Sequence, residues 1–341
     1  MLHTSDFDFE LPTELIASHP LEKRDASRML VVNGNEIQDK HIRDFLDFLQ
    51  PGDVVVFNNS RVIPARFMAD GHEITLHTAV SDKDWWGLCK KFNKINVGDT
   101  LTMEDDTTLN VIDKDEESGL LLHFNCDNVF DVLNAVGKMP LPPYMKREAE
   151  VADQTRYQTV YADPLGSMAA PTAGLHFTDE LMNEIEKRGA KIVKVTLHVG
   201  AGTWMPVKTE NLAEHKIHSE WCCITPAQAE IINNAPRVIA VGTTSLRTLE
   251  SAAIDAPNGM RVAPICRTTD IFITPGYKFR AVDVLLTNFH LPKSTLFMLV
   301  SAFSGLNEMK NAYSHAVAEK YRFFSYGDCC LLFKKEKTDG I

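Results

Sequence analysis

Short apolar runs alternate with helix-like, amphipathic segments through the second half of the chain. Runs bounded by turn residues predict buried strands. These strands are expected at 54–57, 193–199, 238–241, 282–286 and 330–333. Capping residues followed by helical spacing predict the intervening helices. These helices are expected at 179–188, 226–234, 246–253, 294–303 and 307–321. Regular alternation of strands and helices predicts an α/β fold.

The segment from residue 67 to about residue 123 has a different pattern. Apolar and polar residues alternate at 73–77, a Gly-containing turn stands at 97–99, and a hairpin is expected at 115–119. The proline-rich stretch 139–144 forms an extended exit. We therefore predict a large α/β catalytic domain made of residues 1–66 and 150–341. A smaller all-β, barrel-like domain, 67–149, is inserted into it.

Composition limits the class of protein. The 341 residues are 44% hydrophobic and 24% charged, with neither a signal peptide nor an apolar run long enough for a bilayer, so a cytoplasmic protein is expected. The formal charge of −11 argues against indiscriminate nucleic-acid binding. Residues 67–149 hold fifteen acidic and eight basic side chains, so a polyanion would contact the rest of the chain. The seven cysteines lack a C-x-x-C spacing and are expected to be reduced.

Four of the twelve histidines fall between residues 176 and 218, among small or hydroxyl-bearing residues. His176 follows Thr-Ala-Gly and precedes a predicted helix cap, a position that suits a general base, a hydrogen-bond donor or a structural histidine. His198 is expected to point away from the apolar face of its strand. Histidines beside small residues can reach a ligand, so this region is the candidate reaction centre.

Polar residues also follow two predicted strands. Thr243, Thr244 and Ser245 lie at a predicted helix start, with Arg247 one turn in, and this arrangement suits either an anion site or an ordinary cap beside a surface arginine. Asn288 ends another strand, and α/β proteins bind ligands at such strand ends.

Three further patterns keep two interpretations each. His198 to Gly202 contains a G-x-G but lacks the third glycine of a dinucleotide loop. His215 and His218 are spaced for a metal, although the absence of H-E-x-x-H or cysteine pairs favours a polar loop. The arginines after strand 54–57 suit either phosphate contacts or surface salt bridges.

Taken in order, these strings resemble the S-adenosylmethionine:tRNA ribosyltransferase-isomerase family of the queuosine pathway over nearly the whole chain. The strings that carry the resemblance include Arg61-Val62-x-Pro64-Ala65-Arg66, Pro140-Leu141-Pro142-Pro143-Tyr144, Tyr157-Gln158-Thr159-Val160-Tyr161, the 169–177 run, the 196–203 run, the 241–250 run, the 287–301 run and the 321–328 run. The chain departs from the family at Asn59-Ser60, where Asp-Thr is usual. An amide in place of a carboxylate gives no reason to assign Asn59 an acid–base role.

The resemblance implies that the ribosyl part of S-adenosylmethionine is transferred to 7-aminomethyl-7-deazaguanine in a tRNA anticodon and isomerised, with release of adenine and methionine. S-adenosylmethionine is then a co-substrate, and no cofactor or metal is expected. The partners are tRNA and S-adenosylmethionine, without a membrane, and the default oligomeric state is a monomer.

The site residues follow from the same resemblance. Proton transfer is assigned to His176 and His198, with the individual roles open. RNA binding is assigned to Arg61 and Arg66. Substrate binding is assigned to Thr172, Gly174, Gly200, Gly202, Thr243, Thr244, Ser245, Arg247, Asn288 and His290. The competing hypotheses are a methyltransferase, a histidine-metal hydrolase and a non-catalytic RNA-binding module.

Overall fold

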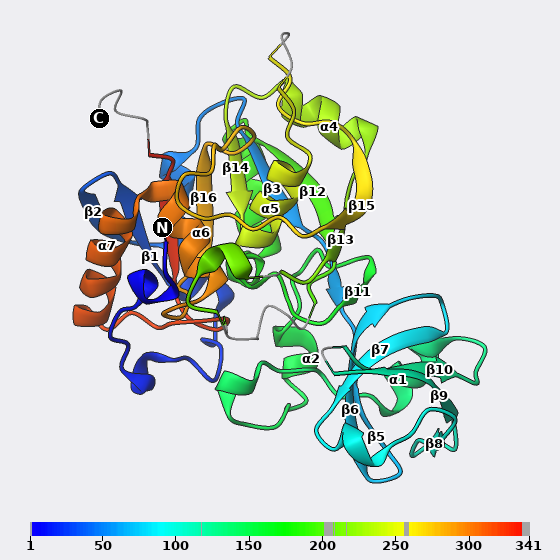
Figure 1. Cartoon of the computed structure of the whole chain (residues 1–341). Helices are drawn as coiled ribbons and strands as arrows, with labels where there is room; N and C mark the ends of the chain where they lie inside the picture. The colour runs from blue at the N-terminus through cyan, green and yellow to red at the C-terminus, as the bar shows by residue number, and fades with distance from the viewer. Residues whose placement is uncertain are drawn as a thin grey trace.

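A nine-stranded mixed sheet and a six-stranded antiparallel sheet organise the protein (Figure 1). The structure, a computed structural model, describes residues 2–116, 118–200, 207, 209–215, 217–255 and 259–335. A two-stranded ribbon of β4 (Arg61–Val62) and β11 (Leu165–Ser167) accompanies the two sheets. The predicted α/β class with a barrel-like β part is confirmed in this coarse form.

The nine strands of the large sheet include all five strands predicted above. In spatial order they are β15 (Ile265–Thr269), β13 (Glu220–Ile224), β12 (Lys191–Leu197), β3 (Val54–Asn58), β14 (Val238–Val241), β16 (Val284–Asn288), β17 (Cys329–Phe333), β1 (Arg28–Asn33) and β2 (Glu36–His41). The central run from β12 to β16 is parallel. Every residue of β3, β14 and β16 is buried, as expected for parallel strands covered on both faces.

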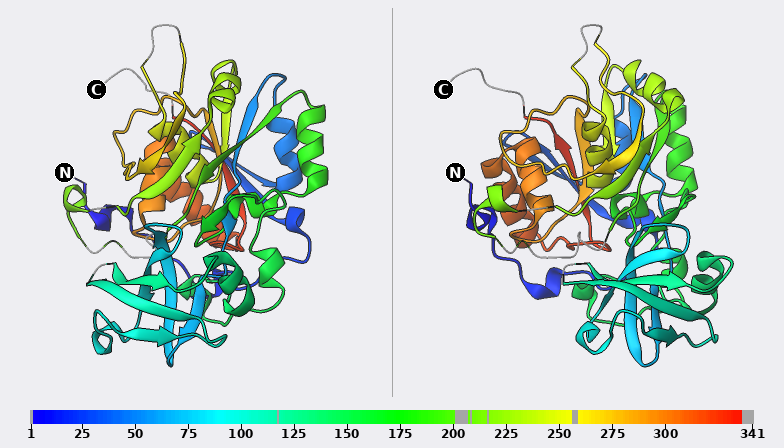
Figure 2. Two further views of the ribbon diagram at one scale, coloured as in Figure 1. Left: turned by 90° about the vertical axis from the view of Figure 1, so that its right-hand side faces the viewer. Right: turned by 45° about the vertical axis from the view of Figure 1, so that its right-hand side comes forward.

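Helices cover both faces of this sheet and enclose two apolar cores (Figure 2). On one face lie α4 (Pro226–Asn233), α5 (Thr243–Ser251), α6 (Thr295–Ser304) and α7 (Leu306–Ala318). On the other lie α3 (Asp179–Lys187) and two 3-10 helices, η4 (Ile42–Phe48) and η7 (Thr172–His176). The hydroxyls of Thr178, Thr225 and Ser294 cap α3, α4 and α6, as their sequences indicate. Helix α5 begins three residues earlier than predicted.

The six-stranded sheet forms the lower part of Figure 1 and has a core of its own. Its strands, in spatial order, are β5 (Arg66–Ala69), β6 (His72–Ala79), β7 (Asp84–Cys89), β10 (Gly119–Phe124), β9 (Thr108–Asp115) and β8 (Thr100–Thr102). A bridge between Ala69 and Met103 brings the two edges together, so the sheet is nearly a closed barrel. The sequence analysis missed α1 (Val129–Val136), which packs Val129 and Leu133 into this core.

A fourth cluster lies at the junction of the two sheets. Met139, Leu141 and Met145 pack there against Tyr157 and Tyr326, and not against the barrel core. The end of the segment predicted as an insertion therefore contributes to the junction. The same region contains α2 (Asp153–Arg156). The remaining 3-10 helices are η1 (Thr4–Phe7), η2 (Thr13–Leu15), η3 (Arg24–Ala26), η5 (Phe92–Lys94), η6 (Pro143–Met145) and η9 (Leu212–Glu214).

The expectation that every cysteine is reduced is wrong for one pair. Cys223 of β13 and Cys266 of β15 are directly opposite in the sheet and form a disulfide. The other five cysteines are free. A separation of 43 residues hides the pair in the sequence, because strand register alone brings the two side chains together. Among the described residues, every helix is too short or too polar to span a bilayer.

Candidate functional site

A cavity opens at the carboxyl ends of β14 and β16, where neighbouring parallel strands leave room for a ligand. It encloses about 630 Å³, including the part open to solvent. Five of the predicted substrate-binding residues line it: Thr172, Thr243, Thr244, Asn288 and His290. They come from η7, from the start of α5 and from the end of β16, so the fold unites residues far apart in the chain.

Gly242 shapes the wall between β14 and α5. Its φ of +89° suits glycine and allows the chain to turn from the strand into the helix. A Cβ at this position would lie 3.5 Å from Thr244 Oγ1 and 3.6 Å from Ala173 Cβ. Thr244 Oγ1 is buried and has no hydrogen-bond partner among the described residues. The wall of the cavity therefore contains a residue whose buried hydroxyl is unsatisfied by the described residues.

Asn288 and His290 form another part of the wall. Asn288 Nδ2 donates to the carbonyl oxygen of Phe324 at 2.9 Å, while its Oδ1 is buried without a partner in the described part of the chain. His290 Nε2 lies 3.2 Å from Thr287 Oγ1. Burial lowers the pKa of His290 to about 3, so its ring is neutral at physiological pH. This wall presents neutral hydrogen-bonding groups.

Aromatic residues that the sequence analysis did not assign complete the cavity. The Tyr144 and Phe324 rings pack with centroids 3.9 Å apart, and the Tyr144 hydroxyl is hydrogen-bonded to Ser325 Oγ. Tyr157 OH is buried without a partner among the described residues. Tyr144 and Tyr157 occur in strings that carry the family resemblance, but no local pattern assigns either residue a role. Their rings give the cavity a surface suited to a flat, aromatic group.

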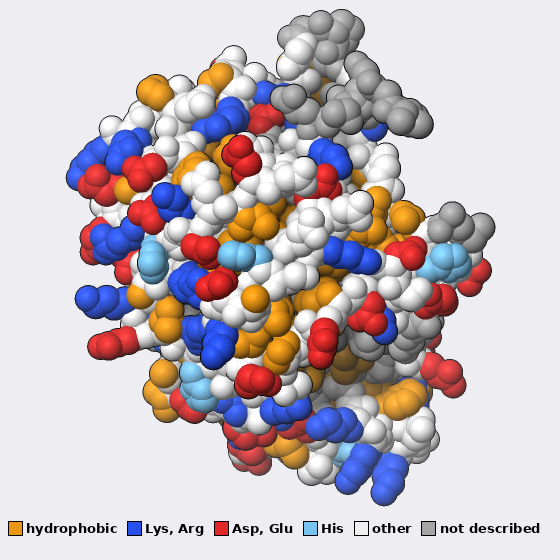
Figure 3. Space-filling view, turned by 90° about the vertical axis from the view of Figure 1, so that its left-hand side faces the viewer, with side chains coloured by type: hydrophobic (Ala, Val, Ile, Leu, Met, Phe, Trp, Pro, Cys, Tyr) orange, Lys and Arg blue, Asp and Glu red, His pale blue; other side chains and the backbone are white. Residues whose placement is uncertain are grey.

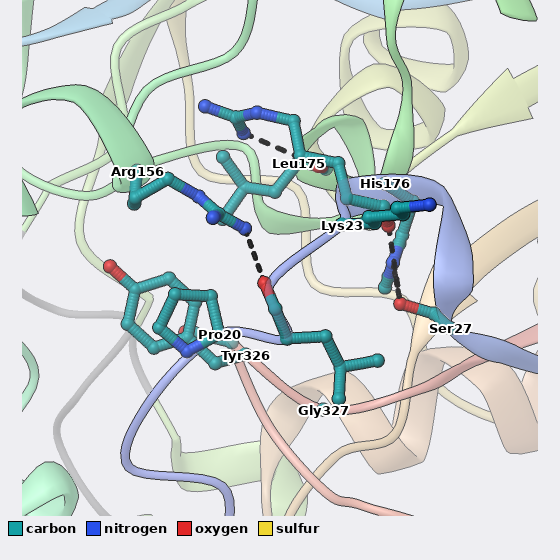
Figure 4. A pocket seen from close by; sticks show the side chains of 11 residues that line it. Pro20, Lys23, Ser27, Arg156, Leu175, His176, Tyr326 and Gly327 are labelled. Carbon is teal, nitrogen blue, oxygen red and sulfur yellow. Dashed lines mark hydrogen bonds between the residues drawn. The ribbon is translucent and has the colours of Figure 1, made fainter.

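His176 lies in a second, smaller pocket of about 280 Å³ (Figure 4). Its Nδ1 is 2.8 Å from Ser27 Oγ, and its Nε2 is buried with no partner in the described residues. Burial, with smaller effects from Arg322 and Arg24, lowers the pKa of His176 to about 4, although the nearby Asn288 amide opposes the shift. Ser325 lines both cavities, so the two adjoin. A neutral imidazole therefore lies beside the larger cavity.

His198 does not line either cavity. It follows β12, with Nδ1 2.7 Å from Ser60 Oγ and its ring stacked on Trp221 at 5.2 Å. Burial lowers its pKa to about 4. Gly166 packs against this ring, because a Cβ there would lie 2.9 Å from His198 Cε1. The two histidines predicted for proton transfer therefore occupy different environments.

Arg247 and Ser245 are buried, and each has a hydrogen-bond partner inside the protein. Arg247 Nε and Nη2 have no partner among the described residues. Arg247 forms an ion pair with Glu220, whose Oε1 also accepts from the Gly200 backbone N–H at 2.9 Å. Ser245 Oγ donates to the Val241 carbonyl at 2.8 Å. Neither side chain lines the larger cavity. The interpretation as an ordinary cap beside a surface arginine is therefore wrong. The N-cap of α5 is Gly242, without a side-chain cap hydrogen bond, Ser245 bonds back to the preceding strand, and Arg247 is buried.

The three glycines predicted to bind the substrate also differ in their surroundings. Gly174 packs against Tyr161, because a Cβ there would lie 2.0 Å from the Tyr161 hydroxyl oxygen. Its small size thus serves packing. Gly200 bonds Glu220 through its backbone, and Gly202 lies outside the described residues.

Comparison with known proteins identifies the family of this chain. A sequence model described as "Queuosine biosynthesis protein" matches residues 4–332. The chain belongs to this family. S-adenosylmethionine:tRNA ribosyltransferase-isomerases from Rickettsia bellii and Parvibaculum lavamentivorans are each 49% identical to it, covering 97% of this chain and 99% of the relative. A crystal structure of S-adenosylmethionine tRNA ribosyltransferase from Thermotoga maritima is 32% identical, covers 96% of this chain and 99% of that one, and has a TM-score of 0.54.

Asn59 and Ser60, where the chain departs from the queuosine-family pattern, both form hydrogen bonds inside the protein. Asn59 Oδ1 accepts from Thr196 Oγ1 at 2.8 Å, and Ser60 is the hydrogen-bond partner of His198. Both residues are therefore used to hold β12 and the residue after it. They do not line either cavity.

The two arginines predicted to bind RNA differ. Arg66 is ion-paired with Glu73 and lies 3.5 Å from Glu148, so its charge is already compensated. For Arg66 this pairing favours a salt bridge over a phosphate contact. Arg61 is exposed on β4. On the face that carries α7, basic and acidic side chains are interspersed, with no dominant basic patch (Figure 3).

The structure gives no support to the metal hypothesis. Within the described residues, no group of three or more His, Cys, Asp or Glu side chains could hold a metal ion. His215 instead packs its ring against Phe272, with centroids 5.3 Å apart.

Proposed function

We propose that this chain is an S-adenosylmethionine:tRNA ribosyltransferase-isomerase of queuosine biosynthesis. It transfers and isomerises the ribosyl part of S-adenosylmethionine onto 7-aminomethyl-7-deazaguanine in the tRNA anticodon, giving epoxyqueuosine-tRNA, adenine and methionine. Family membership over residues 4–332 is the observation that carries this proposal. The cavity that unites five predicted substrate-binding residues supports it.

S-adenosylmethionine occupies the larger cavity in this proposal. The Tyr144–Phe324 pair offers an aromatic surface for adenine. Thr244 Oγ1 is buried and lacks a partner among the described residues. The Tyr157 hydroxyl lies near Ser325, and the Asn288 amide lies near His176. Unpartnered buried polar atoms are costly, so a ligand that bonds them recovers free energy.

His176 is the proposed proton-transfer residue. The positive sulfur of S-adenosylmethionine acidifies the adjacent 5′ carbon of the ribose, and a base can then remove its proton. The His176 ring is neutral, has an unpartnered Nε2 and lies near Asn288 at the wall of the larger cavity. Adenine leaves more readily when a donor protonates its nitrogen. His198 has a supporting role, since its ring stacks on Trp221 away from both cavities.

The cofactor requirement, oligomeric state, location and domain organisation are proposed as well. S-adenosylmethionine is a co-substrate, and the reaction uses no further cofactor. The protein acts as a cytoplasmic monomer. Residues 67–149 constitute an inserted domain, and the tRNA contacts the rest of the chain, with Arg61 as one contact. Arg66 is omitted because its charge is already paired.

The test is a single-turnover assay with S-adenosylmethionine and tRNA that carries the 7-aminomethyl-7-deazaguanine base. Adenine, methionine and digested nucleosides are followed by mass spectrometry. Equal release of adenine and methionine, in step with an epoxycyclopentane nucleoside, is expected. S-adenosylhomocysteine as the product would instead show methyl transfer and overturn the proposal.

Two histidine variants test the assigned roles. His176→Gln should lower the single-turnover rate by about 100-fold or more, in the range of a general base. His198→Gln should lower it by about tenfold at most, because His198 does not line the cavities. Thermal melting establishes that both variants fold. A His176→Gln protein that folds and retains the wild-type rate would refute the assignment.

A further inference from the structure

The pocket around His176 is lined by cations and by no carboxylate. Lys23, Arg24 and Arg156 belong to its wall, as Figure 4 shows for Lys23 and Arg156. Arg322 lies close enough to lower the pKa of His176. In a chain with a formal charge of −11, such a group of cations needs an explanation.

Backbone carbonyls hold the two arginines in place. Arg24 donates to the carbonyl oxygens of Leu175 at 3.3 Å and Thr155 at 2.8 Å. Arg156 donates to those of Leu21 at 2.6 Å and Glu22 at 2.9 Å. Carbonyl oxygens fix the guanidinium groups but do not neutralise their charge. The described residues form no ion pair with any of the four cations.

The guanidinium groups also keep unused hydrogen-bonding capacity. Arg156 Nε and Arg322 Nη1 are buried and have no partner among the described residues. Burial, with a smaller contribution from Arg156, lowers the pKa of Arg24. Burial also lowers the pKa of Arg322, although the nearby Asp328 carboxylate opposes this shift. An oxyanion in this pocket would offset the repulsion between the cations and accept hydrogen bonds from the unused N–H groups.

We infer that this pocket binds a phosphodiester group of the tRNA backbone, beside the nucleotide whose base enters the larger cavity. This inference rests on the proposed function. Ser325 lines both cavities, so a phosphate in one adjoins a base in the other. Guanidinium groups suit phosphate because their planar N–H donors match its oxygens.

The methionine end of S-adenosylmethionine fits this pocket less well. It carries an α-ammonium group next to its carboxylate, and three lining cations without a lining carboxylate would repel the ammonium. A phosphodiester carries one negative charge and no positive charge. The charge of the pocket thus favours RNA over the methionine carboxylate.

Charge-removing variants of two pocket residues test the inference. Lys23 is exposed, so Lys23→Gln should leave the fold intact. Arg156→Gln removes a cation that also anchors residues 21 and 22, and Arg156→Lys is its charge-conserving counterpart. The matched controls are Lys187→Gln and Arg188→Gln. Both control residues are exposed on or next to α3, and Arg188 also donates to a backbone carbonyl, that of Leu46.

The dissociation constant for tRNA is measured over a range of salt concentrations, together with the KM for S-adenosylmethionine. Lys23→Gln should weaken tRNA binding by roughly threefold to tenfold, and Arg156→Gln by about tenfold or more. Each should lower the slope of log Kd against log salt by about 0.7 to 0.9, the value for one released counterion. The KM for S-adenosylmethionine and the behaviour of both controls should stay within twofold of wild type.

Two outcomes would overturn the inference. In one, Lys23→Gln leaves both tRNA affinity and salt slope unchanged. In the other, the KM for S-adenosylmethionine rises while tRNA affinity stays constant, which assigns the pocket to the methionine carboxylate. Failure of the proposed function is a separate result, because the wild-type enzyme would then release no adenine or methionine. If Arg156→Gln does not fold, Lys23→Gln and Arg156→Lys still decide the outcome.

Discussion

The buried ion pair between Glu220 and Arg247 offers a quantitative test of how this site is held together. Their side chains are 6% and 10% exposed. Glu220→Gln preserves size and can still accept from the Gly200 N–H, but it leaves the guanidinium as an unpaired buried charge. Breaking a buried pair in this way costs about 3 to 5 kcal/mol. This is a large share of the roughly 5 to 15 kcal/mol that stabilises a folded protein.

The loss is measured as the free energy of unfolding in urea. Glu184→Gln provides the matched control, since Glu184 and Lys187 form an ion pair with side chains 45% and 69% exposed. An exposed pair of this kind contributes about 0.3 to 0.5 kcal/mol on a helix. The same substitution should therefore cost about tenfold less free energy at position 184 than at position 220.

A double-mutant cycle separates pairing from other effects. Arg247→Met in the Glu220→Gln background removes the unpaired charge and should recover most of the lost free energy, giving a coupling of about 2 kcal/mol or more. A loss below about 1 kcal/mol for Glu220→Gln, with no coupling, would refute the reasoning. The folded double variant should also keep its KM for S-adenosylmethionine within about threefold of wild type. A larger rise would support the prediction that Arg247 binds the substrate.

Two further predictions concern buried groups. The pKa of His290 is lowered by burial from 6.5 to about 3, so only the unfolded chain binds this proton between these pH values. The free energy of unfolding should therefore decrease as the pH is lowered below 6.5, by about 1.4 kcal/mol per pH unit for this one residue. His290→Gln should remove this contribution to the pH dependence of the unfolding free energy, measured in urea at pH 5 to 6.5. Thr287→Val is the control, and it should lower stability without changing the pH dependence. Equal pH dependence in wild type and His290→Gln would contradict the prediction. Gly174→Ala places a methyl group 2.0 Å from the Tyr161 hydroxyl oxygen and should cost about 1 to 3 kcal/mol in the same measurement. Among the described residues, Gly200→Ala meets no atom closer than 3.9 Å and should cost about 1 kcal/mol or less, so equal losses for the two variants would argue against the packing role of Gly174.

Local signals predicted the main elements because they depend on neighbouring residues. The threonine before α3 caps that helix through Leu181 N, as the sequence predicts. The apolar run of β3 is buried throughout. The short helix α1 was missed, since eight residues in a strand-rich segment give a weak periodic signal.

The candidate site was only partly predictable from the residues themselves. Thr244 and Asn288 stand at the ends of strands, where α/β folds bind ligands, and both line the larger cavity. Nothing local shows that Glu220 of β13 forms an ion pair with Arg247 of α5, because the two residues belong to different elements.

The sequence by itself determined the order of the main strands and helices, the caps and the family resemblance, because each depends on local pattern or on strings of consecutive residues. Tertiary structure decided which polar groups remain unpaired. It placed His176 beside a pocket and His198 against Trp221, joined Cys223 to Cys266, and gathered Lys23, Arg24 and Arg156 without a lining carboxylate. These outcomes depend on strand order and register, which bring together residues that are distant in the sequence, and no local pattern carries that information.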